Sequence, residues 1–202
     1  RLVPGWGDEP SALGALVEYA SRYAGVLEQA GVAFQAPENA AQCHVIERLE
    51  GNITTDFGAP AVIPAADRLP LEWAELRRWT AVLEACWQAF DRAAGRAAGR
   101  ELRTGPRGGG RDLDKIVRHV LEGEGAYLAR LAWRHKPDSS LSPQEQLPRM
   151  RQAALDALES AARNGLPEQG PRGGVIWPVR YFIRRAAWHA LDHAWEIEDR
   201  IL

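Results

Sequence analysis

A pair of histidines near the end of the chain, His189 and His193, has the spacing of metal ligands. In a helix, side chains at positions i and i+4 lie one turn apart on the same face, so both imidazoles can reach one cation. At about 100° per residue, His193 falls inside the apolar stripe of its helix, and His189 lies at the edge of that stripe. The pattern favours two ligands that face a neighbouring helix. The alternative is a pair of core histidines that bind no metal.

A third ligand is needed, because two histidines alone bind a metal weakly. His119 is the candidate, since it lies at the edge of the apolar stripe of an earlier helical segment and can face a neighbouring helix from there. Three neutral imidazoles would leave positions open for water or substrate, as in catalytic metal sites. This donor set suits Zn²⁺, Ni²⁺ or Fe²⁺ and does not choose among them.

Glu124 and two tryptophans are the other residues that the pattern assigns to this site. Glu124 lies near the middle of the apolar stripe of its helix, and a carboxylate buried there needs a partner. That partner is either a ligand histidine, which Glu124 would orient through a hydrogen bond, or an arginine across the helices. Trp188 and Trp195 stand on either side of the histidine pair and are expected to wall a pocket above the metal.

Four helical segments must position these residues. Within each of them apolar residues recur every three to four positions, and polar or glycine-rich segments separate them. The segments begin near Pro70, Asp112, Ser142 and Pro178, where proline or a capping side chain suits a first helical turn. The pattern predicts an antiparallel four-helix bundle over residues 70–202.

Residues 1–69 have a different pattern, which predicts a small α+β segment in front of the bundle. One helix is expected over residues 11–30, and residues 42–49 alternate in a way that is typical of a strand. Because the sequence begins at Arg1 without a methionine, we expect that a leader or a first strand precedes it. The chain as a whole is therefore predicted to be mainly α.

Composition excludes several classes of protein. Of the 202 residues, 46% are hydrophobic, and the formal net charge is -2. No run approaches the roughly 20 apolar residues of a membrane span, and the charge argues against a dedicated nucleic-acid binder. Cys43 and Cys86 are too few for a disulfide framework or a thiolate cluster, so a cytoplasmic protein is expected.

The segments that carry the three histidines resemble the DinB-like family. The likeness rests on residues 119–128 (HVLEGEGAYL) and 184–199 (RRAAWHALDHAWEIED) and extends over about residues 70–202. Members of that family are four-helix bundles whose metal is bound by one histidine of the second helix and an H-x-x-x-H pair of the last. His119, His189 and His193 match these three ligands one for one.

The resemblance also implies a class of reaction. Characterised relatives include S-transferases that use bacillithiol or mycothiol and a mycothiol-dependent maleylpyruvate isomerase, which has a glutamate where this chain has His189. The implied activity is a metal-dependent transferase, or a related isomerase or hydrolase, that activates a low-molecular-weight thiol or water. Its expected partners are that thiol and a small-molecule electrophile, and a homodimer is expected.

A second, fainter likeness concerns the first segment, which is similar to the latter half of a HicB-like fold. It rests on residues 3–6 (VPGW), the helix over residues 11–30 and the strand near Cys43. HicB domains are antitoxin modules of α+β type, and the initial strands of that fold are not in this sequence. This likeness leaves open a non-catalytic interaction protein, or an antitoxin-like regulatory protein with a metal-binding bundle.

Overall fold

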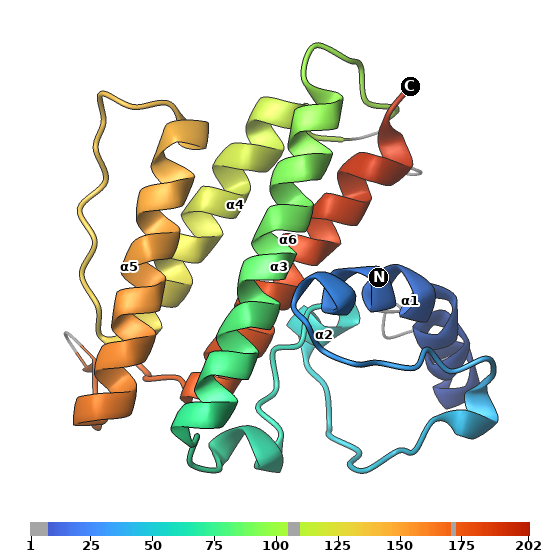
Figure 1. The fold of residues 1–202 in the computed structure, drawn as a ribbon, viewed down its shortest axis with the longest axis horizontal. Coiled ribbons are helices and arrows are strands. Elements are labelled where there is room, and N and C mark those ends of the chain that lie inside the picture. The colour runs from blue at the N-terminus through green and yellow to red at the C-terminus, as the bar shows by residue number, and fades with distance from the viewer. Residues whose placement is uncertain (1–7, 105–109, 171–172) are drawn as a thin grey trace. The chain divides into compact units, whose positions relative to one another are not determined.

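The computed structural model describes residues 8–104, 110–170 and 173–202 (Figure 1). These residues are mainly α, as predicted: they form six α-helices and three short 3-10 helices, and no β-strand occurs among them. The chain divides into two compact units, residues 1–70 and residues 71–202, each with its own contacts. Residues 3–6, which contribute to the HicB-like resemblance, lie outside the described part.

The first unit contains one long helix followed by short helical turns and extended segments. The long helix begins where Asp8 accepts a hydrogen bond from the backbone N–H of Ser11, and Gly31 follows its end with a φ of 66°. The helices of this unit are α1 (Glu9–Gln29), η1 (Ala40–Gln42), α2 (Ile53–Asp56) and η2 (Ala65–Arg68).

The strand predicted for residues 42–49 does not form within the described structure. Gln42 ends the 3-10 helix η1, and residues 43–50 have no regular secondary structure. The side chain of Ile46 is 89% exposed. An alternating pattern favours an extended backbone, but a strand also needs a neighbour to complete its hydrogen bonds. The prediction of a small α+β segment was therefore wrong for the described residues.

Four long helices make up the second unit, and local signals in the sequence set their starts. Asp112 and Ser142 accept backbone hydrogen bonds as N-caps, and Ser142 forms a capping box with Glu145. The first of the four begins at a capping box between Glu72 and Glu75 rather than at Pro70. The helices are α3 (Trp73–Ala97), α4 (Leu113–Leu128), which the short η3 (Ala129–Leu131) extends, α5 (Pro143–Asn164) and α6 (Val179–Arg200).

The four helices pack as two parallel pairs of opposite direction. Helices α3 and α6 lie side by side in the same direction, since Glu75 pairs with Arg180 near their starts and Arg96 pairs with Glu198 near their ends. The guanidinium of Arg163, at the end of α5, lies over the ring of Trp73, at the start of α3. Helix α5 therefore runs against α3. Figure 1 shows α4 running in the same direction as α5, with residues 132–142 returning along them.

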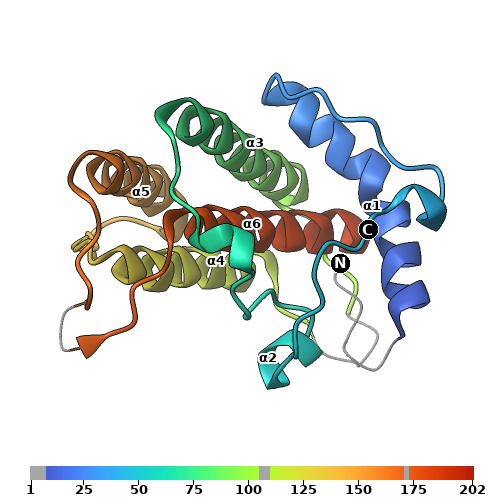
Figure 2. The ribbon, with the colours of Figure 1, turned by 90° about the horizontal axis from the view of Figure 1, so that it is seen from below.

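The core of this unit lies between the four helices. Helix α6 is flanked by α3 and α4 (Figure 2), and it contributes apolar side chains to both contacts. Fully buried large side chains from all four helices meet there: Leu83, Phe90, Ile116, Val120, Leu158, Phe182 and Ile183. Helix α5 adds mainly alanines. None of the described helices combines the length and apolar character that crossing a bilayer requires.

Candidate metal centre

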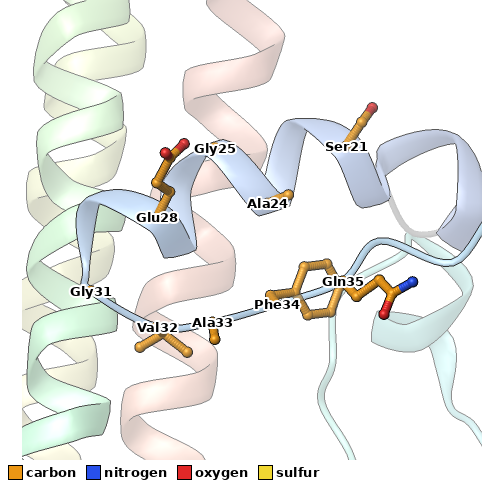
Figure 3. Close-up of a pocket in the computed structure, with 9 residues that line it drawn as sticks. All are labelled: Ser21, Ala24, Gly25, Glu28, Gly31, Val32, Ala33, Phe34 and Gln35. Carbon is orange, nitrogen blue, oxygen red and sulfur yellow. The ribbon is translucent and has the colours of Figure 1, made fainter.

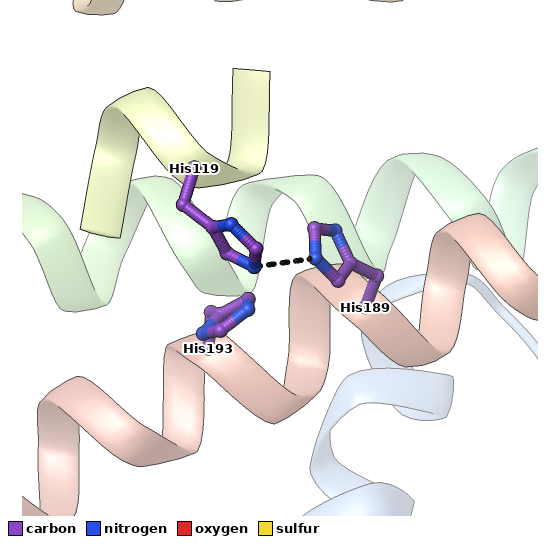
Figure 4. Close-up of side chains that lie close together, drawn as sticks. All are labelled: His119, His189 and His193. Atoms are coloured by element: carbon purple, nitrogen blue, oxygen red, sulfur yellow. Dashed lines mark hydrogen bonds between the residues drawn. The ribbon is translucent and has the colours of Figure 1, made fainter. Parts of the chain in front are cut away.

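Three histidines from two helices converge inside the second unit (Figure 4). His119 projects from α4, and His189 and His193 project from successive turns of α6. The two histidines of α6 are buried, with 5% and 7% of their surfaces exposed, and His119 is half-buried. The structure thus brings together the three residues that the sequence selected.

The spacing of the three rings is close to what one ion requires. The Nε2 atoms of His119 and His189 are 3.4 Å apart. The ring centroid of His193 is 4.9 Å from the ring centroid of His119 and 4.7 Å from that of His189. Two nitrogens bound about 2.1 Å from one ion at a tetrahedral angle are also about 3.4 Å apart. One possible ligand atom from each histidine lies within 4.8 Å of the others.

The electrostatics of the site keep the imidazoles in the form that binds metal. Burial, followed by the proximity of His193 and His119, lowers the pKa of His189 to about 2. Burial and the neighbouring His193 also lower the pKa of His119. Both rings are therefore neutral at pH 7, and metal-binding imidazoles must be neutral. The donor set fits a divalent transition metal. Without a metal, the 3.4 Å contact would be a hydrogen bond between two neutral rings.

Glu196 is a residue of this site that sequence reasoning missed. Its Oε2 atom lies 2.8 Å from Nδ1 of His193, three residues earlier on the same helix. Burial acts to raise the pKa of Glu196, but its hydrogen bonds to His193 and Arg200 prevail, and the pKa is lowered. The i, i+3 spacing was the available signal, because side chains three apart on a helix are neighbours.

Gly123 was also missed, and it provides the space in which His189 lies. A Cβ atom at Gly123 would be 2.5 Å from Cε1 of the His189 ring, far inside van der Waals contact. A glycine within a helix costs about 1 kcal/mol relative to alanine, so its presence in the middle of α4 was a signal of close approach.

Glu124 is buried as predicted, but its partner is an arginine and not a ligand histidine. Nε of Arg151 on α5 lies 3.5 Å from Oε1 of Glu124, and the same guanidinium donates to Asp91 of α3 at 2.8 Å. Neither carboxylate oxygen of Glu124 has a closer hydrogen-bond partner. Burial raises its pKa to about 7. Of the two partners considered for this carboxylate, the structure has the arginine.

The role of the two tryptophans as walls of a pocket stays a prediction. The ring centroid of Trp188 is 6.1 Å from that of His189, and Arg185 lies 4.7 Å above the Trp188 ring. Trp195 is half-buried seven residues further along α6. The ring of Tyr127 is closer to the site, with its centroid 5.4 Å from that of His189.

A cavity of about 850 Å³ lies elsewhere, in the first unit (Figure 3). Helix α1 and the segment after it line this cavity, with Glu28, Phe34 and Gln35 among the lining side chains. None of the described residues that line it is a histidine, so it is separate from the candidate metal centre.

Comparisons with protein-family models, with characterised proteins and with solved structures gave no match to this chain. The DinB-like and HicB-like resemblances therefore stay predictions.

Proposed function

We propose that this chain binds a divalent transition metal, Zn²⁺, Ni²⁺ or Fe²⁺, through His119, His189 and His193, in a four-helix bundle of the DinB-like family. The observation that carries the proposal is the 3.4 Å approach of two Nε2 atoms from different helices, with a third imidazole beside both. The neutral form of His189 and the burial of His189 and His193 support it. Burying polar rings between helices costs free energy, and binding a cation would offset that cost.

The proposed activity is transfer of a low-molecular-weight thiol, of the bacillithiol or mycothiol type, to a small electrophile. A divalent cation held by three imidazoles lowers the pKa of a thiol or water at its open positions. The chain would supply the ligands, and the burial of His189 and His193 would shield a bound thiolate from solvent on their side. Half-buried His119 marks the side from which a substrate would approach. Isomerase or hydrolase chemistry would use the same ligands, and a cytoplasmic location fits such thiols.

A non-catalytic interaction protein is the second candidate, because the first unit exposes many large apolar side chains. Such side chains are commonly covered by a partner, and a second copy of this chain would give the expected homodimer. The exposed residues are Leu16, Phe34, Val45, Ile46, Leu49, Ile53, Phe57 and Leu69.

Elemental analysis of the purified protein tests the metal site. The wild type is expected to carry close to one transition-metal ion per chain, and His193→Ala is expected to lose it. His44→Ala is the matched control, because His44 is exposed in the other unit and lies outside the cluster. Equal metal content in the wild type, His193→Ala and His44→Ala would refute the proposed metal site.

Transfer assays with bacillithiol, mycothiol and glutathione then separate the two functions. Turnover with one of these thiols that is lost in His193→Ala supports the transferase. A metal-loaded wild type that turns over none of them favours the interaction protein.

A further inference from the structure

His193 is held differently from the other two histidines of the cluster. Its Nδ1 atom has a carboxylate partner, Glu196, at 2.8 Å. The Nδ1 atom of His189 is buried and has no hydrogen-bond partner in the described structure. We propose that Glu196 and Arg200 are positioning residues that fix the His193 tautomer, with Nδ1 protonated and the Nε2 lone pair directed at the metal centre. This inference rests on the proposed metal site.

Each oxygen of the Glu196 carboxylate has its own hydrogen-bond partner. Its Oε2 faces Nδ1 of His193, and its Oε1 accepts a hydrogen bond from Nη1 of Arg200 at 2.6 Å. A carboxylate only accepts hydrogen bonds, so the proton between Glu196 and His193 belongs to Nδ1. In the neutral imidazole the second ring nitrogen, Nε2, then carries no proton. Carboxylates commonly fix metal-binding histidines in this way.

Arg200 is itself anchored by the segments that connect α3 and α4. Its Nε donates to the carbonyl of Arg103 at 2.7 Å, and its Nη2 donates to the carbonyl of Arg111 at 2.9 Å. Only 12% of its side chain is exposed. All three guanidinium nitrogens therefore have acceptors, and the arginine cannot swing away without breaking bonds on both sides.

The backbone around Arg200 strengthens this anchor. The N–H of Arg103 donates to the carbonyl of Arg200 at 2.7 Å, and Leu102 and Ile201 form an antiparallel bridge. The end of α6 is thus tied to the residues that follow α3. A series of contacts thus links this backbone through Arg200 and Glu196 to His193, a ligand of the candidate metal centre.

A merely structural role for the Glu196–Arg200 pair would leave the His193 tautomer and the metal affinity unchanged. Glu196→Gln separates the two possibilities, because it keeps the size of the side chain and leaves one acceptor oxygen. Arg200 requires that oxygen, so the amide NH₂ faces His193 and favours a lone pair on Nδ1. The proton then moves to Nε2, where it blocks the position that a metal needs.

The first experiment reads the tautomer in the metal-free protein. Long-range ¹H–¹⁵N spectra of the imidazoles are expected to show protonated Nδ1 at His193 in the wild type and protonated Nε2 in Glu196→Gln. Glu198→Gln is the matched control, since Glu198 lies two residues further along α6 and pairs with Arg96. An unchanged His193 tautomer in Glu196→Gln overturns the inference, whether or not the wild type binds metal.

The second experiment measures the Zn²⁺ affinity by competition with a chromophoric chelator. Glu196→Gln is expected to bind Zn²⁺ about 10- to 100-fold more weakly than the wild type, and Glu198→Gln is expected to bind equally well. Arg200→Met is expected to weaken binding as well, because it releases Glu196. Far-UV circular dichroism checks that each variant is folded. Wild-type affinity in folded Glu196→Gln overturns the positioning role, whereas a wild type that binds none of Zn²⁺, Ni²⁺ and Fe²⁺ overturns the proposed function.

Discussion

Replacing Gly123 by alanine is expected to remove the metal centre while leaving the helices in place. The new Cβ would lie 2.5 Å from Cε1 of His189, 3.2 Å from its Nδ1 and 3.3 Å from its Nε2. Carbon atoms in contact need about 3.5 Å, so the ring must retreat by about 1 Å. Metal–nitrogen distances tolerate about 0.2 Å, so a ring displaced this far cannot complete the site. We expect the Zn²⁺ affinity to fall more than 10-fold.

The effect of this substitution on stability is expected to be small, because two terms oppose each other. Alanine is favoured over glycine within a helix by about 1 kcal/mol. Overpacking against a buried ring costs about 1 to 3 kcal/mol. The metal-free variant should therefore lose only about 0 to 2 kcal/mol of unfolding free energy. Loss of metal without loss of fold is the signature of a site that depends on this glycine.

Zn²⁺ competition titrations and urea unfolding of the metal-free proteins measure the two quantities. Gly125→Ala is the matched control, because it changes the same helix two residues further on. Its Cβ would meet only the terminal Cε of Met150, at 3.2 Å, and that flexible end can move aside. Wild-type Zn²⁺ affinity in Gly123→Ala would refute the close packing of His189 on α4 and the site built on it.

Four further predictions concern the metal and the core. Zn²⁺ at 100 times its Kd should raise the unfolding free energy of the wild type by about 2.7 kcal/mol and should not stabilise His193→Ala, which thermal melts can measure. Glu124 has a folded pKa of about 7 against an ordinary 4.5. Between these pH values only the folded state keeps the proton, so wild-type stability should fall by about 3 kcal/mol relative to Glu124→Gln as pH rises from 4.5 to 7, in urea titrations. Arg151→Met should cost about 3 to 5 kcal/mol at pH 8, where Glu124 is left charged and buried, and less at pH 5. Phe90→Ala, at a fully buried position, should cost about 3 to 5 kcal/mol by the same titrations at every pH.

The helices were predictable because their signals are local. Periodic apolar residues and the capping residues Asp112 and Ser142 act within a few positions of one another, and the structure has the corresponding helices. The relative directions were not predictable from these signals. Residues 132–142 run back along α4 and α5, and nothing in their composition distinguishes that path from a short turn. The strand predicted for residues 42–49 failed for a related reason, since its formation depends on a neighbour that the pattern does not specify.

The candidate site shows the same division between local and distant information. His189 and His193 were found through their i, i+4 spacing, and Glu196 could have been found through its i+3 spacing from His193. The contact of Gly123 with His189 joins two helices that are 66 positions apart in the sequence, as the residue numbers give, and no local pattern encodes it. The partner of Glu124 posed the same problem, since burial was predictable from the apolar stripe but the choice between a histidine and an arginine was not.

The cluster is better explained by binding than by stability. Apolar side chains at these three positions would bury the same surface without desolvating ring nitrogens, and a buried polar atom without a partner costs free energy. The Nδ1 atom of His189 bears that cost, since it has no partner in the described structure. The glycine opposite it adds a further cost of about 1 kcal/mol to helix α4. Such costs are expected to gather where a bound ligand offsets them, and here both lie where the three imidazoles meet.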